Sequence, residues 1–188
     1  ERWHCFDAHS NLSNSNKEVL INQLNSAITL TNQKLRTATH VIITLGTAWI
    51  YRHIESQNMV ANCHKVPQNN FSKELLSVDE ISSSLENVIC NLQKLNPKMN
   101  IVFTLSPVRH LKDGFLENSQ SKAHLLTAIH KVINSNIHKG QNFYFPSYEI
   151  MIDDLRDYRF YKSDMIHPSE TAIDYIWEQF KWVWINVN

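Results

Sequence analysis

Three short apolar runs alternate with long stretches of helical periodicity in this chain, and the alternation limits the folds that it can adopt. The runs cover residues 41–45, 101–105 and 143–145. The first two are apolar on both faces, which is typical of strands buried in a parallel sheet. Apolar residues at helical spacing predict helices over about 17–36, 77–95, 119–137 and 168–187. This order predicts an α/β fold with helices on both faces of a parallel sheet.

Capping residues mark the helix boundaries. A capping box, in which a Ser lies three residues before a Glu, starts the first helix at Ser15 and the second at Ser77. Gly140 ends the third helix, and Pro168 suits the first turn of the fourth. The buried stripe predicted for the fourth helix consists of Ile173, Ile176, Trp177, Phe180, Trp184 and Val187.

The charge balance and the scarcity of glycine exclude several function classes. Lys and Arg number 18, as do Asp and Glu, so the chain has no net field that would hold nucleic acid or an anionic membrane. A P-loop and a dinucleotide fingerprint both need closely spaced glycines. The three glycines of this chain are far apart. We therefore expect no nucleic-acid partner and no cofactor.

The length of 188 residues fits a single domain over 1–188. The longest uncharged apolar-rich stretch, 40–51, is too short to span a bilayer, which takes about 20 residues. Three cysteines without a CxxC pair argue against a disulfide framework and favour a reducing compartment. The expected location is the cytoplasm, and export stays open because the sequence begins at Glu1 rather than Met.

The pattern Asp164-x-x-His167, directly before the last helix, is the strongest chemical signal. An Asp at this spacing can accept the Nδ1–H of the imidazole, which leaves Nε2 free to take a proton from a nucleophile. A capping Asp and a packing His would give the same pattern. The pair follows the third strand, however, and ligands of parallel sheets bind beyond the carboxyl ends of the strands. Its position therefore favours catalysis.

Two further segments follow the first two strands. Gly46, Thr47 and Ala48 can aim backbone N–H groups at a developing oxyanion, or they can form only a turn that needs glycine. Arg109 and His110 can bind a carboxylate or phosphate, or they can form only a surface charge pair. Because carboxyl ends of parallel strands meet at one edge, we expect these residues beside Asp164 and His167.

The stretch 47–77 has no clear hydrophobic period, which predicts a long loop, and long loops are often functional. The adjacent pair Cys63-His64 in this loop, with His4-Cys5, resembles a set of metal ligands. Zinc sites, however, use ligand pairs at set spacings rather than adjacent residues. We therefore expect no metal site.

Five segments, in the same order, resemble the GSCFA domain family. They are Thr44-Leu45-Gly46-Thr47-Ala48-Trp49 with Tyr51, and the segments 60–67, 106–114, 144–149 and 157–169. The similarity runs from about Trp3 to Phe180. The family is bacterial and looks like a branch of the SGNH (GDSL-like) hydrolase superfamily.

The resemblance implies a flavodoxin-like three-layer α/β/α fold and the hydrolysis of acyl esters of a small molecule or a glycan. It implies Asp164 and His167 as the catalytic pair. Gly46 matches by position the Gly-x-Asn-Asp block of the superfamily, but Ala48 stands where that block has Asn. Asn62 or His64 is the expected substitute for this missing oxyanion donor.

The Gly-Ser-Cys-Phe-Ala block that names the family is not in this sequence. We expect it to lie N-terminal to Glu1, so that this chain lacks the nucleophile and the first strand and is catalytically incompetent alone. Residues 41–45 would then form an exposed edge through which two copies can pair. An acyltransferase on the same machinery and a non-catalytic binding domain are the alternative functions.

Overall fold

The computed structural model describes residues 2–135 and 141–185. Its helices are α1 (Lys17–Thr37), α2 (Val78–Leu95), α3 (Phe115–Ile133), the short α4 (Ser147–Glu149) and α5 (Glu170–Trp184). Its strands are β1 (Trp3–His4), β2 (Ser13–Asn14), β3 (His40–Leu45), β4 (Trp49–His53), β5 (Met59–Val60), β6 (Phe71–Leu75), β7 (Asn100–Leu105) and β8 (Asn142–Phe145). Within these ranges, no helix combines the length and the hydropathy that crossing a bilayer requires.

A parallel sheet with the strand order β3-β7-β8 forms the centre of the fold. β7 is the middle strand, and residues 101–105 are buried throughout, as their apolar composition predicts. β3 pairs with β7 from His40 opposite Asn100 to Leu45 opposite Leu105. The predicted α/β class with a parallel sheet is therefore confirmed.

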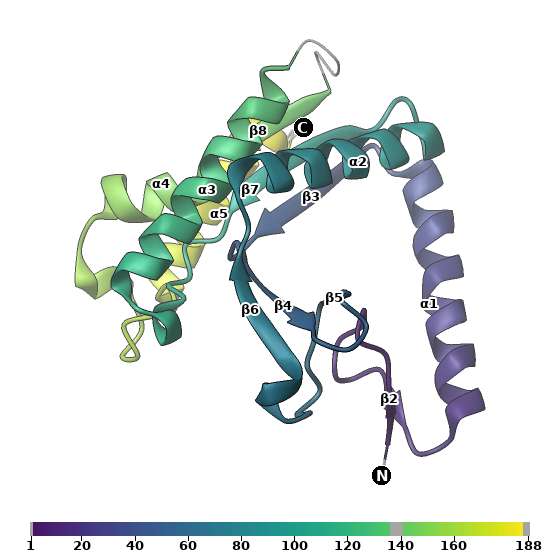
Figure 1. The fold of residues 1–188 in the computed structure, drawn as a ribbon. Helices are drawn as coiled ribbons and strands as arrows, with labels where there is room; N and C mark the ends of the chain where they lie inside the picture. The colour runs from purple at the N-terminus through teal and green to yellow at the C-terminus, as the bar shows by residue number, and fades with distance from the viewer. Residues whose placement is uncertain (1, 136–140, 186–188) are drawn as a thin grey trace.

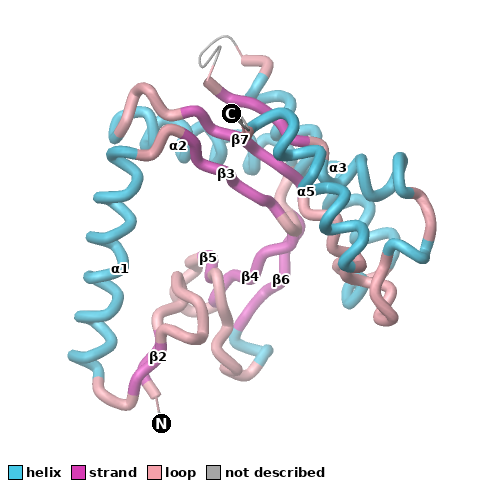
Figure 2. Tube along the Cα trace, turned by 180° about the vertical axis from the view of Figure 1, so that it is seen from behind, coloured by secondary structure: helices cyan, strands magenta, loops and turns pink. Residues whose placement is uncertain are grey.

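Helices cover the two faces of this sheet (Figure 1). α2 and α3 pack on one face, where Ile89 and Ile129 meet Phe103 of β7 in the main apolar core. α5 packs on the other face, where Phe180 meets Val102 and Phe145. Figure 2 shows α5 in front of the sheet when the molecule is seen from behind.

The apolar run alone predicts burial of 41–45 on both faces, and this prediction is wrong, whereas the exposed edge expected for a chain without the first strand agrees with the sheet order. β3 lies at the edge of the sheet, and its side chains alternate between exposed and half-buried. Ile42 is 52% exposed, and within the described residues α5 leaves an open groove beside it. Ile173 and Trp177 of α5 are exposed too, which contradicts the stripe predicted for that helix. These three residues line an apolar groove of about 300 Å³ between the sheet and α5.

The prediction of a long loop over 47–77 is also wrong. The segment forms an antiparallel sheet with the order β5-β4-β6, in which Trp49 pairs with Leu75 and His53 with Phe71. The strands are short and polar side chains interrupt their apolar pattern, so no period emerges. The sheet begins directly after Gly46 and Thr47, and it returns the chain to α2.

The helix boundaries follow the local capping chemistry in part. Ser77 forms the predicted capping box with Glu80 at the start of α2. At α1, however, Asn16 rather than Ser15 is the N-cap, and its side chain accepts hydrogen bonds from two backbone N–H groups of the first turn. α3 begins at Phe115, four residues before the prediction, because Gly114 already breaks the preceding turn. The predicted positions of Ile137, Gly140 and Val187 lie outside the described residues.

Candidate functional site

Asp164 and His167 form a hydrogen-bonded pair in the loop before α5. The Nδ1 atom of His167 lies 2.7 Å from Oδ2 of Asp164. The other carboxylate oxygen accepts the backbone N–H groups of Ile166, at 2.9 Å, and of His167, at 3.0 Å. The expected hydrogen bond is therefore present. Since the carboxylate engages Nδ1, Nε2 is the available ring nitrogen of a side chain that is 55% exposed.

The hydrogen bonds to Asp164 lower its pKa to about 2. The backbone N–H of His167 has the largest effect, followed by the His167 side chain and by the N–H of Ile166. Asp164 is therefore ionised across the neutral range. An ionised carboxylate on Nδ1 fixes the ring orientation and stabilises an imidazolium when Nε2 takes up a proton.

Arg109 holds the loop that carries this pair. Its backbone N–H donates to the carbonyl of Ile166 at 3.1 Å, and its Nη1 donates to the carbonyl of Met165 at 2.8 Å. The guanidinium also lies over the aromatic rings of Phe115, Tyr158 and Tyr161. Arg109 therefore acts as a clamp on the loop, and its predicted contact with an anionic substrate stays a prediction.

His110 lies directly beside Gly46. A Cβ atom at Gly46 would stand 3.3 Å from Nε2 of His110, which is tighter than an ordinary contact, so the close approach of the ring favours glycine here. Burial lowers the pKa of His110, and the charges of Lys122 and His167 act in the same direction, while Asp113 opposes them. His110 therefore lies against Gly46, and the charge of His167 acts on its ring.

The turn after β3 offers fewer free N–H groups than the sequence suggests. The N–H of Ala48 donates to Oγ of Ser121 at 2.7 Å, so it is not available to an oxyanion. Oγ1 of Thr47 lies 3.1 Å from the same Ser121 hydroxyl. Within the described residues, the N–H groups of Gly46 and Thr47 have no acceptor. These two residues of the turn can therefore present a backbone donor, whereas Ala48 cannot.

Lys122 lies beneath this edge of the sheet, and no sequence motif marks it. It is 2% exposed, and its Nζ donates to the carbonyls of Gly46 at 2.8 Å and Ser106 at 2.6 Å. Burial lowers its pKa to about 8. Helical spacing offers a signal, because position 122 falls on the same face of α3 as the buried Leu125 and Ile129.

A protein-family model, that of the GSCFA family, matches residues 1–180. The chain belongs to the GSCFA family. No curated protein and no solved structure matches it. The matched range contains the Asp164–His167 pair, the turn at Gly46 and the buried Lys122, so the described geometry belongs to the family domain.

Asn62 and His64 of this GSCFA chain contact the N-terminal segment. Nε2 of His64 lies 2.7 Å from the carbonyl of Cys5, and its ring stacks on His4 with centroids 4.7 Å apart. Oδ1 of Asn62 accepts the N–H of His64 at 2.8 Å. Within the described residues, none of these contacts reaches Gly46 or His167. A role of Asn62 or His64 as oxyanion donor therefore stays a prediction without a supporting contact.

The thiol of Cys63 lacks the features of an activated nucleophile. Burial raises its pKa, whereas a reactive thiol needs a lowered one. Across 2–135 and 141–185, no group of three or more His, Cys, Asp or Glu side chains is placed to hold a metal ion. The adjacent pairs His4-Cys5 and Cys63-His64 therefore form no metal centre in the described structure.

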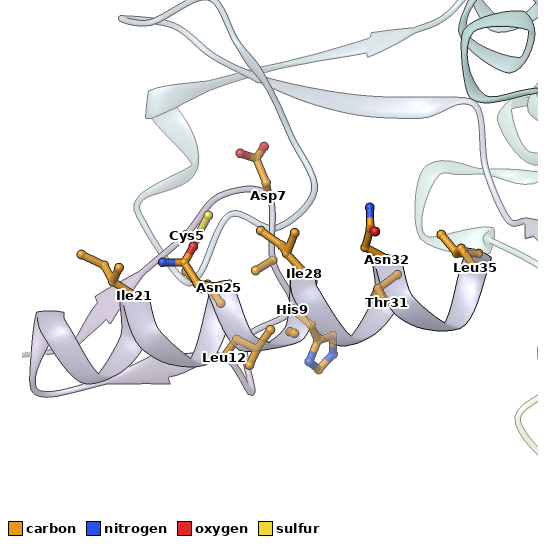
Figure 3. A pocket seen from close by; sticks show the side chains of 13 residues that line it. Cys5, Asp7, His9, Leu12, Ile21, Asn25, Ile28, Thr31, Asn32 and Leu35 are labelled. Carbon is orange, nitrogen blue, oxygen red and sulfur yellow. The ribbon is translucent and has the colours of Figure 1, made fainter. Parts of the chain in front are cut away.

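A cavity of about 800 Å³ lies between α1 and the N-terminal segment. Figure 3 shows Ile21, Ile28 and Leu35 along α1, with Cys5 and Leu12 of the N-terminal segment near them. The walls are mainly apolar, and no residue of the Asp164–His167 loop or of the turn at Gly46 lines the cavity. The cavity is therefore separate from the candidate site.

Proposed function

We propose that this GSCFA chain is part of an ester hydrolase of the SGNH (GDSL-like) type, which removes acyl groups from small-molecule or glycan esters. The observation that carries the proposal is the 2.7 Å hydrogen bond between His167 Nδ1 and Asp164 Oδ2, in a histidine side chain that is largely exposed. Serine and cysteine hydrolases of unrelated folds use this arrangement to activate their nucleophile.

The fold that we propose is flavodoxin-like, with a further strand along the free edge of β3. The exposure of Ile42 on β3 and of Ile173 and Trp177 on α5 supports it, because added elements would cover these side chains. The Gly-Ser-Cys-Phe-Ala block of the family, absent from the printed sequence, would supply the nucleophile from that strand. A strand at this edge ends beside Gly46, since neighbouring parallel strands run in register.

In the proposed reaction, Nε2 of His167 takes the proton of the nucleophile as the nucleophile attacks the carbonyl carbon of the ester. The carbonyl π electrons move onto oxygen, and the N–H of Thr47 stabilises this oxyanion. Collapse of the tetrahedral intermediate breaks the ester C–O bond, and the leaving alkoxide receives the proton from His167. Water then attacks the acyl-enzyme with His167 again as base, which releases the acid and restores the nucleophile. Asp164 stays ionised throughout.

The direct test measures hydrolysis of p-nitrophenyl acetate by the full-length protein. We expect His167→Ala to lower kcat by roughly a thousandfold or more. Asp164→Asn lowers it as well, because an amide that donates to Nδ1 favours the wrong ring tautomer. The matched control is His40→Ala, since His40 is an exposed histidine at the opposite end of β3. A folded His167→Ala variant with the wild-type rate would refute the proposal.

Two further measurements separate the alternative functions. A fluorophosphonate labels an activated serine, and iodoacetamide labels an activated cysteine faster than the ordinary free thiols of Cys5, Cys63 and Cys90. A binding domain shows neither the serine labelling nor the fast cysteine labelling. Product analysis with and without a sugar acceptor then distinguishes the hydrolase from an acyltransferase, in which a sugar hydroxyl replaces water in the second step. Free acid as the main product in both conditions supports the hydrolase.

A further inference from the structure

Lys122 links the carboxyl ends of all three parallel strands. Its Nζ donates to the carbonyl of Gly46, after β3, and to that of Ser106, after β7. It also lies over the ring of Tyr148, after β8, at 5.7 Å from the ring centroid. One ammonium group on α3 therefore contacts every loop that leaves this end of the sheet.

The burial of this ammonium is costly. Lys122 is 2% exposed, and within the described residues it forms no salt bridge with a carboxylate. A buried charge without a counter-charge destabilises a fold, and an apolar side chain of similar length would fill the same space without that cost. The charge therefore has a role that packing alone does not explain.

The hydrogen bond to Gly46 sets the direction of the next peptide N–H. The described peptide bonds are all trans, so the carbonyl of Gly46 and the N–H of Thr47 point in opposite directions within one peptide plane. Because Lys122 holds the carbonyl toward α3, the N–H of Thr47 points away from α3. A cationic donor on the carbonyl also polarises the peptide group, which makes its N–H a stronger donor.

We propose that Lys122 is a positioning residue of the candidate site, which fixes and polarises the Gly46–Thr47 peptide so that the Thr47 N–H can stabilise an oxyanion. This role in catalysis rests on the proposed esterase function. The charge of Lys122 also acts on His110. Three titratable groups influence His110: Lys122 from α3, Asp113 from the preceding turn and His167 from the loop before α5. Lys122 therefore also helps to keep His110 neutral.

The test compares Lys122→Met with Lys131→Met in the full-length protein. Lys131 lies on the same helix but is exposed, where it pairs with Asp79, so it controls for the loss of a lysine from α3. We expect Lys122→Met to lower kcat for p-nitrophenyl acetate roughly 10- to 100-fold. KM changes by less than about threefold, because the donor acts on the transition state rather than on bound substrate. A folded Lys122→Met variant with wild-type kcat would overturn the catalytic role.

An NMR measurement tests the positioning itself, independently of activity. A carbon-detected spectrum correlates the Gly46 carbonyl carbon with the Thr47 nitrogen. In the wild-type protein the chemical shift of this signal should change with a midpoint near pH 8, because Lys122 loses its proton there. His110, whose pKa is lowered, and Tyr148, whose pKa is raised, titrate outside this window. In Lys122→Met the shift disappears and the pKa of His110 rises, whereas Lys131→Met matches the wild type.

The two experiments fail in distinguishable ways. A Gly46–Thr47 signal that does not respond near pH 8 in the wild-type protein refutes the positioning role, even if Lys122→Met does not fold. The other outcome is a signal that responds near pH 8 in a wild-type protein that has no acyl-transfer activity. This result supports the positioning of the peptide by Lys122 and refutes the esterase function. Lys122→Arg retains the charge, and we expect it to recover part of the lost kcat.

Discussion

The guanidinium of Arg109 donates a hydrogen bond to the carbonyl of Met165, 2.8 Å away, and Met165 lies between Asp164 and His167 in the chain. Met165 has a φ of 57°, a left-handed conformation that is unfavourable for a side chain with a Cβ atom. The contact with Arg109 therefore stabilises a strained position at the centre of the loop.

We expect Arg109→Ala to lower kcat/KM for p-nitrophenyl acetate by roughly tenfold, because small displacements of a catalytic group are costly. The NMR signal of the His167 ring should broaden at the same time, as the loop samples more conformations. Arg159→Ala serves as the control, since Arg159 pairs locally with Asp157 on the surface. Equal rates for Arg109→Ala and the wild type would show that the loop keeps its geometry without the clamp.

The lowered pKa of Asp164 predicts a pH dependence of stability. The carboxyl has a pKa of about 2 in the folded chain, against 3.8 as its ordinary value. Between about pH 4 and pH 2 the unfolded chain therefore binds more protons than the folded chain. The contribution of the Asp164 carboxylate to stability is complete above about pH 4 and is lost as the pH falls toward 2. Urea unfolding should show a smaller loss of stability over this range for Asp164→Asn than for the wild type.

Part of the acid dependence must persist in Asp164→Asn, because other carboxyl groups with lowered pKa values contribute to it. They are Glu74, Asp79, Glu80 and Asp157. Identical slopes for the variant and the wild type below pH 4 would contradict the pKa that the structure gives to Asp164.

The close approach of Gly46 and His110 predicts the effect of a single methyl group. In Gly46→Ala the new Cβ would lie 3.3 Å from the His110 ring, which must then shift by a few tenths of an ångström. We expect the free energy of unfolding to fall by about 1 kcal/mol. In a His110→Ala background, the substitution Gly46→Ala should lower the free energy of unfolding much less, because the ring that it would contact is gone. Additive effects in this cycle would mean that the two residues do not compete for space.

The uncovered edge at β3 predicts self-association of the chain as printed. Ile42 is 52% exposed on a strand whose outer N–H and C=O groups face no other strand of the described residues. We expect light scattering to show a mass that rises with concentration, and Ile42→Lys to shift it toward the monomer, because an edge lysine opposes strand pairing. Ile54→Lys, at a residue that is 50% exposed in the turn after β4, should leave the mass unchanged. A monomer at all concentrations would contradict this prediction.

Local signals predict the parts of the structure in which neighbours along the chain decide the conformation. The capping box at Ser77 is complete within four residues, and α2 begins there. The Asp164–His167 hydrogen bond spans three residues, so the spacing alone anticipates it. β7 is also predicted well, because a run that is apolar on both faces requires burial on both sides, and the central position provides it.

Local signals fail where distant contacts decide. The same apolar pattern in 41–45 does not by itself reveal that β3 lies at an edge, since this depends on which strand pairs with it; the expected edge follows from the block that the sequence lacks and not from the pattern. Arg109 meets Met165 across 56 residues, and Lys122 meets Gly46 across 76, so neither role is visible in a motif. Only the apolar neighbours of Lys122 on α3 indicate that its side chain faces inward.

The antiparallel sheet β5-β4-β6 is inserted in the chain between β3 and β7, and it also influences how the chain folds. The pairing of β3 with β7 joins His40 to Asn100, 60 residues apart, and conformational entropy opposes the closure of such long loops. The contacts between β4 and β6 are far more local, as between Arg52 and Glu74, 22 residues apart, and the N–H of Leu76 returns to the carbonyl of Ala48. We expect this local sheet to form before β3 pairs with β7, because its strands are closer in the sequence. Once this sheet has formed, Ala48 and Leu76 are neighbours. The loop that must close when β3 pairs with β7 then consists mainly of α2 and its flanking turns.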